Sequence, residues 1–193
     1  MTASRALLAR LRRGDPAALT VVVEENARRL YRAARGTGLL REDAEDLVQD
    51  VFVTFVQGLD RFEGRSGVRT WLFGILYHKL QERRRFNARF EQHDAIDEVF
   101  ESRFDAHGNW IRPAMAPDRE ATSREASVAL GECIENLPPL QRAVFELRQV
   151  EELSATEASN ILGPTVTHIG VLLHRARTRL RECLERKGWT SSR

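Results

Sequence analysis

The chain contains 193 residues, of which 42% are hydrophobic and 7% aromatic. This is enough apolar material for one ordinary core or two small ones. No stretch of the sequence reaches the roughly 20 uncharged apolar residues that a membrane helix needs. The N-terminal residues contain several arginines and lack the apolar core of a signal peptide. The composition excludes a membrane-inserted protein, and we expect a cytoplasmic one.

The net charge of +2 is distributed unevenly along the chain. Residues 1–90 carry 17 Lys and Arg against 11 Asp and Glu, residues 91–125 carry 4 against 9, and residues 126–193 carry 9 against 8. A basic block, an acidic segment and a nearly neutral block indicate two folded units joined by a tether. The basic block also favours contact with nucleic acid.

Hydrophobic residues recur with helical spacing, and no alternating strand pattern is present. Asp15 and Pro16 predict an N-cap and a first helical residue. In the first part of the chain, helices are predicted over residues 16–35, 42–59 and 70–90, with a loop over 61–68. In the last part, they are predicted over residues 125–136, 139–149, 154–162 and 165–187.

These elements predict an all-α fold of two small helical domains. The first is expected over residues 1–91 and the second over 125–193. Acidic residues, a glycine and two prolines interrupt the helical pattern between them, so residues 92–124 are predicted to form an irregular acidic linker. Trp110 in this linker is equally compatible with docking on a partner and with packing on a domain.

The last two predicted helices form a helix-turn-helix, because Gly163-Pro164 ends one and Thr165 caps the next. The apolar residues that define the inward face of the second helix are Val166, Ile169, Leu173, Ala176, Leu180 and Leu184. Leu172 is expected off this face, and the exposed N-terminal end is expected to enter a major groove. The arginines at 175, 177, 179 and 181 are expected either to bind phosphates or to form a solvated surface.

The two cysteines, Cys133 and Cys183, are far apart and have no CxxC spacing. Neither a disulfide framework nor a standard zinc site is therefore indicated. Each cysteine falls on the apolar face of a predicted helix. We interpret both as buried, inert thiols without a redox role.

Two sets of motifs follow one another in the chain. The first is Asp43-Ala44-Glu45-Asp46-Leu47-Val48-Gln49-Asp50-Val51-Phe52, Phe62-Glu63-Gly64-Arg65-Ser66 and Arg69-Thr70-Trp71-Leu72-Phe73. The second is Leu137-Pro138-Pro139-Leu140-Gln141-Arg142, Leu153-Ser154, Ile161-Leu162-Gly163 and Leu173-His174-Arg175-Ala176-Arg177. They resemble regions 2 and 4 of the extracytoplasmic-function (ECF) subfamily of sigma-70 RNA polymerase sigma factors. The resemblance covers roughly residues 10–90 and 126–187.

The resemblance implies an alternative sigma factor that binds core RNA polymerase, directs it to specific promoters and helps to open the minus-ten element. The residues implied for docking on the clamp helices of the largest polymerase subunit are Asp43, Asp46, Gln49 and Asp50. Those implied for minus-ten DNA are Arg61, Phe62, Gly64, Arg65, Ser66, Arg69, Trp71, His78, Lys79, Arg83 and Arg84. Those implied for minus-thirty-five DNA are Thr165, Thr167, His168, Val171, Leu172, Arg175, Arg177 and Arg179.

The implied partners are core polymerase, including the flap of its second subunit, promoter DNA and an anti-sigma factor, in a stress response.

Two features depart from the family pattern. Gly170 and Leu172 stand where many relatives carry basic residues, and His78 stands where many have Asn. Spacing favours Trp71 as a core residue and leaves Phe73 open between core packing and base stacking.

Other classes of function remain as alternatives. A sigma-like decoy would bind an anti-sigma factor without recognising promoters, and a free-standing helix-turn-helix regulator would leave the first domain unexplained. The sequence contains no nucleophile elbow, phosphate loop, metal-ligand spacing or paired carboxylates, so we expect no enzyme, cofactor or metal. No heptad seam remains for a homo-oligomer.

Overall fold

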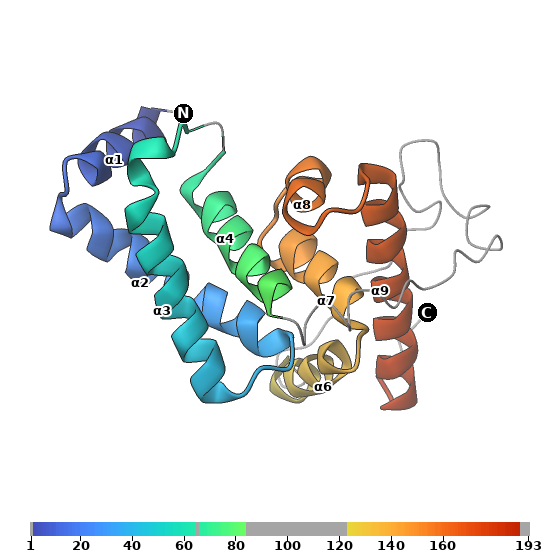
Figure 1. Cartoon of the computed structure of the whole chain (residues 1–193). Helices are drawn as coiled ribbons and strands as arrows, with labels where there is room; N and C mark the ends of the chain where they lie inside the picture. Colours follow the sequence, from blue (N-terminus) through green and yellow to red (C-terminus); the bar gives the residue numbers. More distant parts are fainter. Residues whose placement is uncertain (1, 65, 84–122, 190–193) are drawn as a thin grey trace. The chain divides into compact units, whose positions relative to one another are not determined.

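The computed structural model describes residues 2–64, 66–83 and 123–189 (Figure 1). All regular structure in these ranges is helical, which confirms the predicted all-α class. The chain divides into two compact units, one built mainly from the helices before residue 84 and the other from those after residue 122. No helix within the described ranges is long and apolar enough to cross a membrane.

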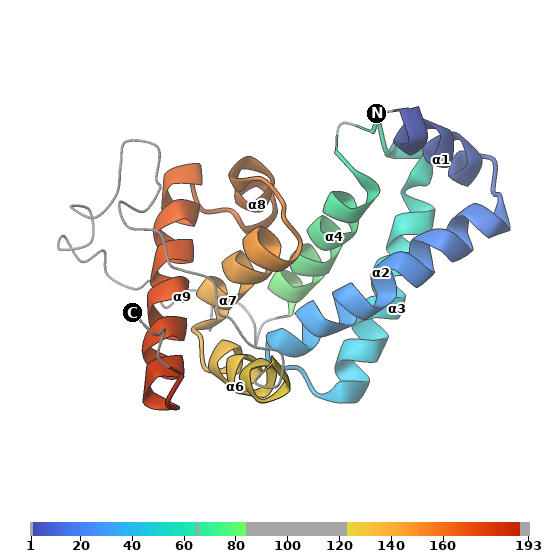
Figure 2. The same cartoon turned by 180° about the vertical axis from the view of Figure 1, so that it is seen from behind.

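The first unit is a bundle of three helices, each packed against the other two. These are α2 (Pro16–Gly36), α3 (Arg41–Gln57) and α4 (Val68–Glu82). Consecutive helices of the bundle run in opposite directions (Figures 1 and 2). The side chains that fill its centre are Leu30, Leu47, Val51, Phe55, Leu72, Phe73, Leu76, Tyr77 and Leu80. Phe73 is thus a core residue and offers no stacking surface.

A further helix that the sequence analysis did not predict, α1 (Thr2–Arg12), packs against α2 and the short turn η1 (Leu59–Arg61). The carboxylate of Asp15 caps α2 by accepting hydrogen bonds from the backbone N–H groups of Ala17 and Ala18, at 3.0 and 3.4 Å. Arg10 donates to the same carboxylate at 2.7 Å, and this hydrogen bond holds the pKa of Asp15 below its ordinary value. The predicted cap is confirmed, and it also ties α1 to α2.

Helix α4 ends earlier than the sequence predicts. Its last helical residue is Glu82, and Arg83 has an extended backbone with φ −73° and ψ 106°. The prediction that this helix continues through residue 83 is therefore wrong, and the rest of its predicted length, residues 84–90, lies outside the described residues. As a result, Arg83 lies at the end of α4 and not on a continuing helical face.

The second unit contains the four predicted helical segments. They are α6 (Ser123–Glu135), α7 (Pro139–Phe145) continued by the π turn η4 (Glu146–Val150), α8 (Ala155–Leu162) and α9 (Val166–Arg186). Helix α9 packs against both α6 and α7. The most deeply buried side chains here include Val144, Leu147, Ile169 and Ala176.

The helix-turn-helix is built from local caps. Ser154 and Glu157 form a capping box at the start of α8: the Ser154 N–H donates to the Glu157 carboxylate at 2.8 Å, and the Glu157 N–H donates to the Ser154 hydroxyl at 3.2 Å. The Thr165 hydroxyl accepts from the His168 N–H at 3.3 Å, which confirms the predicted cap of α9. Gly163 has φ +96°, a left-handed conformation that suits glycine at the end of α8.

The inward face of α9 differs from the predicted stripe at two positions. Val166 is 47% exposed, whereas Leu172 is only 3% exposed. Because α9 packs on two helices, its buried arc is wider than one stripe and includes both Leu172 and Leu173. The expectation that Leu172 lies off the inward face is wrong.

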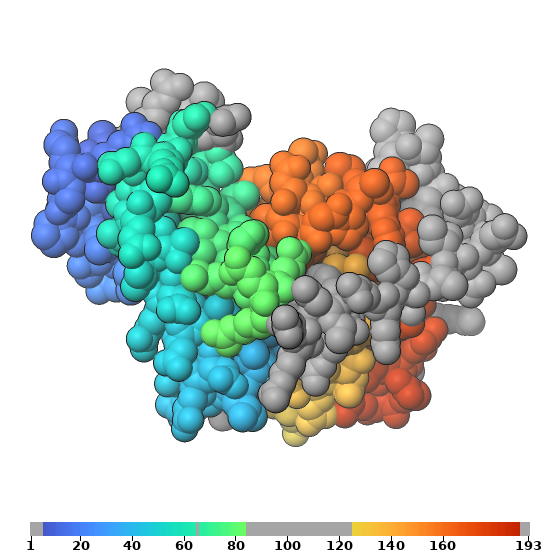
Figure 3. Space-filling model, viewed as in Figure 1, coloured from blue at the N-terminus to red at the C-terminus, as the bar shows by residue number. Residues whose placement is uncertain are grey.

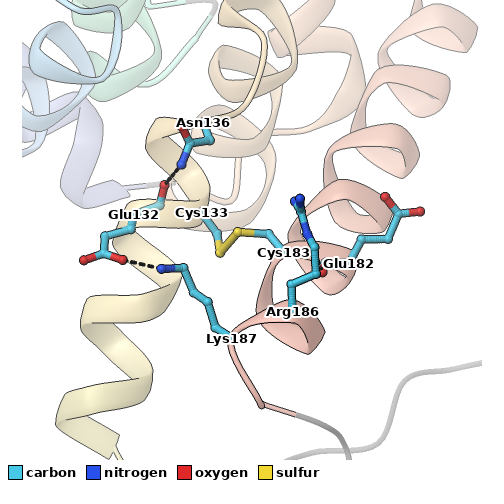
Figure 4. Close-up of a disulfide and its surroundings, with 7 residues drawn as sticks. All are labelled: Glu132, Cys133, Asn136, Glu182, Cys183, Arg186 and Lys187. Atoms are coloured by element: carbon cyan, nitrogen blue, oxygen red, sulfur yellow. Dashed lines mark hydrogen bonds and ion pairs between the residues drawn. A yellow bond between two sulfur atoms is a disulfide. The ribbon is translucent and has the colours of Figure 1, made fainter.

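The interpretation of the cysteines as separate, inert thiols is also wrong. Cys133 of α6 and Cys183 of α9 form a disulfide, with their Cα atoms 5.9 Å apart (Figure 4). Helix α6 lies against α9 through a buried apolar cluster that contains Leu137, Ala176 and Leu180. This packing places side by side two residues that are 50 positions apart in the sequence.

Candidate functional site

A pocket of about 390 Å³ opens on the first unit, where the end of α3, the loop after it and the start of α4 meet. Its lining consists of Thr54, Gly58, Arg61, Phe62, Glu63, Ser66, Trp71 and Ile75. Four of these, Arg61, Phe62, Ser66 and Trp71, are among the residues predicted for minus-ten DNA. The structure therefore gathers these four predicted residues around one cavity.

Two stacked aromatic rings form part of the pocket. The rings of Phe62 and Trp71 are parallel, with their centroids 4.3 Å apart, and Phe55 contacts Trp71 at a tilt, with centroids 4.9 Å apart. Trp71 is half-buried, so it is less fully buried than its spacing predicts. A Cβ atom on Gly58 would lie only 3.0 Å from Cζ2 of Trp71, so the absence of a side chain at Gly58 makes room for the indole.

Helix α1 supports the loop from outside the pocket. The Arg12 guanidinium donates a hydrogen bond to the carbonyl oxygen of Phe62. Gly64 has φ +72°, and a Cβ atom there would lie 3.2 Å from Cδ2 of Leu8. The sequence offered no signal for either contact, because α1 and the loop are about fifty residues apart.

The remaining residues predicted for minus-ten DNA are spread along α4 and beyond. Arg69 and His78 are exposed, and Lys79 and Arg83 are half-buried. The Nδ1 atom of His78 lies 3.6 Å from Oε1 of Glu82. Arg65, Arg84 and the linker residue Trp110 lie outside the described residues.

The acidic face predicted on α3 is present. Asp43, Asp46, Gln49 and Asp50 are all exposed, while Leu47, Val48 and Val51 are buried on the opposite side. Two valines that the sequence analysis did not include extend the same stripe: Val53 is 54% exposed and Val56 is 42% exposed. Helix α3 is the cyan-to-turquoise surface of the first unit in Figure 3.

In the second unit, the predicted DNA-facing end of α9 is accessible in part. Thr165, Val166 and Thr167 are exposed, and His168 and Val171 are half-buried. A Cβ atom on Gly170 would meet no other atom within 4 Å. The first turn of α9 therefore has small exposed side chains, and Gly170 leaves open space beside it.

The arginines of α9 at positions 175, 177, 179 and 181 do not form one row. At 100° per residue, positions two apart on a helix face nearly opposite sides. Arg175 is 6% exposed and Leu172 is 3% exposed, so both lie on the buried side of α9, and their contacts with DNA stay predictions. Arg177 donates to the side-chain oxygen of Gln149 at 2.7 Å, and desolvation of its guanidinium, together with the charge of nearby Arg148, lowers its pKa, although the residue as a whole is exposed. Arg179 and Arg181 are exposed.

Each of the two units matches a model of a known protein family. The family model described as Sigma-70 region 2 matches residues 22–90, and that described as Sigma-70, region 4 matches residues 127–180. A probable RNA polymerase sigma factor of Haemophilus influenzae is 32% identical over 151 residues, covering 75% of this chain and 78% of the relative. RNA polymerase sigma factor NccH of Alcaligenes xylosoxydans xylosoxydans is 30% identical over 180 residues, covering 93% and 94%.

Solved structures agree with these matches. The structure of CnrH in complex with the cytosolic domain of CnrY has a TM-score of 0.64 and 26% identity, covering 95% of this chain and 98% of that one. RpoE in complex with the anti-sigma factor NepR from Bartonella quintana has a TM-score of 0.57 and 26% identity, covering 88% and 96%. The chain belongs to the ECF subfamily of the sigma-70 family. It is an alternative sigma factor, a protein of transcription initiation.

Proposed function

We propose that this sigma factor docks on core RNA polymerase through one stripe of α3 and opens promoters by taking an unstacked base into the pocket beside Trp71. The pocket is the observation that carries the proposal. An aromatic pair forms part of its wall, and the lining also contains a cation, Arg61, and the polar side chains of Glu63 and Ser66. Stacking on an aromatic ring is worth about 1–3 kcal/mol per base, and it serves any base because every base has a π face.

The strand that supplies the base would continue along α4. Arg69, Lys79 and Arg83 offer positive charges along and at the end of this helix, and phosphates of a single strand bind such charges without regard to sequence. His78 is exposed and can donate to a base or a phosphate. Arg65 and Arg84 are proposed for the same strand from sequence alone.

The α3 stripe fits a docking surface for the clamp helices of the largest polymerase subunit. Asp43, Asp46 and Asp50 provide negative charge that sets register and speeds encounter with a basic partner. Val53 and Val56 add exposed apolar area at the end of the same stripe, which a partner helix would cover.

The N-terminal end of α9 is proposed to read the minus-thirty-five element. Thr167 and His168 can reach base edges, and exposed Val166 offers a methyl surface to thymine. Gly170 contributes no side chain, so few base contacts are expected from the next turn. We therefore propose that this recognition is weak, and that binding to the polymerase flap and the minus-ten contacts supply most of the promoter affinity.

An anti-sigma factor and a cytoplasmic location complete the proposal. Two structural relatives are solved with protein partners, one of them named as an anti-sigma factor. These complexes are compatible with a sigma factor that is held inactive and then released. They do not favour the decoy alternative, for which the formed pocket would have no use.

A pair of glycine substitutions tests the pocket. Gly58→Ala places a methyl group 3.0 Å from Trp71 and 3.2 Å from the Thr54 carbonyl oxygen, so the indole must shift. Gly74→Ala is the matched control, because its Cβ atom meets nothing within 4 Å. Holoenzyme is reconstituted with core polymerase, and a promoter is found by in-vitro transcription on genomic fragments.

Loss of one stacking contact predicts that Gly58→Ala weakens binding of the non-template minus-ten strand by about 5- to 150-fold. Core-polymerase affinity and the circular dichroism spectrum should stay unchanged in both variants. Equal strand affinity for the two variants would refute the pocket assignment. Failure of the unaltered chain to bind core polymerase or to direct a defined start site would refute the whole proposal in favour of the decoy.

A further inference from the structure

The disulfide lies in a part of the second unit that the proposed DNA contacts do not use. Cys183 is near the C-terminal end of α9, whereas the proposed base contacts are at the N-terminal end. The bond joins α9 to α6, and the chain contains no other cysteine (Figure 4). The bond therefore needs an explanation separate from promoter recognition.

The two cysteine residues differ in their exposure to solvent. Cys133 is 2% exposed, whereas Cys183 is half-buried. Both line a pocket of about 490 Å³ whose other lining residues are Asn136, Leu137, Arg179, Glu182 and Arg186. We expect a small molecule that enters this pocket to react at the more exposed cysteine, Cys183.

The charges around the bond favour sulfur anions. Arg179 and Arg186 line the pocket, and Lys187 pairs with Glu132 across the gap between the two helices. Glu182 points away from the sulfurs in Figure 4, while Arg186 extends alongside Cys183. Nearby cations stabilise both an attacking thiolate and the thiolate that leaves.

The packing around the bond does not depend on the bond alone. Leu137, Ala176 and Leu180 are buried beside it, and the partly buried side chains that pack on this cluster include Ile134, Phe145 and Leu184. The Lys187–Glu132 ion pair spans the same two helices. Breaking the disulfide removes a covalent link between elements that are also held by this packing, so we expect the reduced unit to stay folded.

We propose that Cys133 and Cys183 form a reversible thiol–disulfide site whose substrate is a thiol reductant that enters the pocket at Cys183. The reductant's thiolate attacks Cys183 Sγ, the S–S bond breaks, and its electron pair leaves on Cys133 Sγ. A second thiolate then attacks the reductant's sulfur in the mixed disulfide and releases Cys183. Two thiols become one external disulfide, and each protein sulfur takes up one proton.

The cellular setting gives this chemistry a use. In a cytosol held reducing by glutathione and thioredoxin, disulfides are transient and are usually redox-sensing or catalytic. The cysteine pair would accordingly be open under ordinary conditions and closed by oxidants. This setting depends on the proposed cytoplasmic location, whereas the chemistry itself can be measured with the purified chain.

The test uses the full chain, oxidised and then exposed to reduced glutathione in native buffer. Samples are quenched with acid, alkylated and mapped by mass spectrometry. We expect a glutathione adduct on Cys183, a free thiol on Cys133, then full reduction, and return of the bond with oxidised glutathione. Three results would overturn the proposal: an adduct on Cys133, reduction only after denaturation, or two free thiols that never join.

Two charge variants sharpen the test. Arg186→Gln removes a cation from the pocket lining and should slow reduction several-fold. Arg181→Gln removes an exposed arginine of the same helix that does not line the pocket, and should leave the rate unchanged. Equal rates for the two variants would contradict the role of the charges, and loss of the helical circular dichroism signal on reduction would contradict the folded reduced state.

Discussion

Removing the disulfide should lower the stability of the second unit by an amount that follows from its loop length. The bond closes a loop of 50 residues. In the chain-entropy description, such a loop restricts the unfolded chain by about 14 cal/mol/K, or about 4 kcal/mol at 25 °C. A small domain has a stability of about 5–15 kcal/mol, so Cys133→Ala with Cys183→Ala should leave it folded but less stable.

Hydrogen exchange measured by mass spectrometry separates the two units in one experiment. The slowest amides of α7 and α9 report the unfolding of the second unit, and those of α2 and α4 report the first. The double variant and the reduced wild-type chain should both lose about 2–4 kcal/mol of protection in the second unit only. A loss below about 0.5 kcal/mol, or an equal loss in both units, would refute the loop-closure reasoning.

Three further changes probe the proposed surfaces. Replacing Asp46 and Asp50 together by Arg should weaken core-polymerase binding about tenfold or more, mainly through slower association, in a salt-dependent way; unchanged anisotropy titrations would count against the stripe. Gly170→Arg should stabilise α9 by about 1 kcal/mol. It should also steepen the slope of log promoter affinity against log salt concentration by about one released counterion. An unchanged slope would show that this position does not contact DNA. Arg12→Met removes the donor to the Phe62 carbonyl and should weaken minus-ten strand binding several-fold with core affinity intact; full strand affinity would show that α1 does not hold the loop.

Much of the fold could be predicted because its causes are local. The caps at Asp15 and Thr165 and the turn at Gly163 depend on neighbours within a few residues. The acidic face of α3 follows from helical spacing alone, and its residues are exposed as expected. The motif resemblance placed four of the eight pocket residues in one predicted site, although it carried no information about their geometry.

The misjudged positions depend on contacts between elements. Leu172 is buried because α9 packs on two helices, while Val166, assigned to the inward face by spacing, is exposed. Arg175 is buried, whereas Arg177, two positions later in the sequence, is exposed. The difference arises because positions two apart face different sides of a helix. A single periodic stripe cannot show how many partners a helix has.

By itself, the sequence determined most of the helices, the caps at Asp15 and Thr165, the acidic stripe and the sigma-70 motifs, because each of these is encoded within a turn or two of helix; it missed α1 and the end of α4. Only the tertiary structure decided that Cys133 meets Cys183, that Arg12 reaches the loop at Phe62, and that Trp71 lines a pocket. The first two contacts join residues about 50 positions apart. Such pairs come together only when helices pack, and packing depends on the complementary shapes of whole faces, which residue spacing does not record.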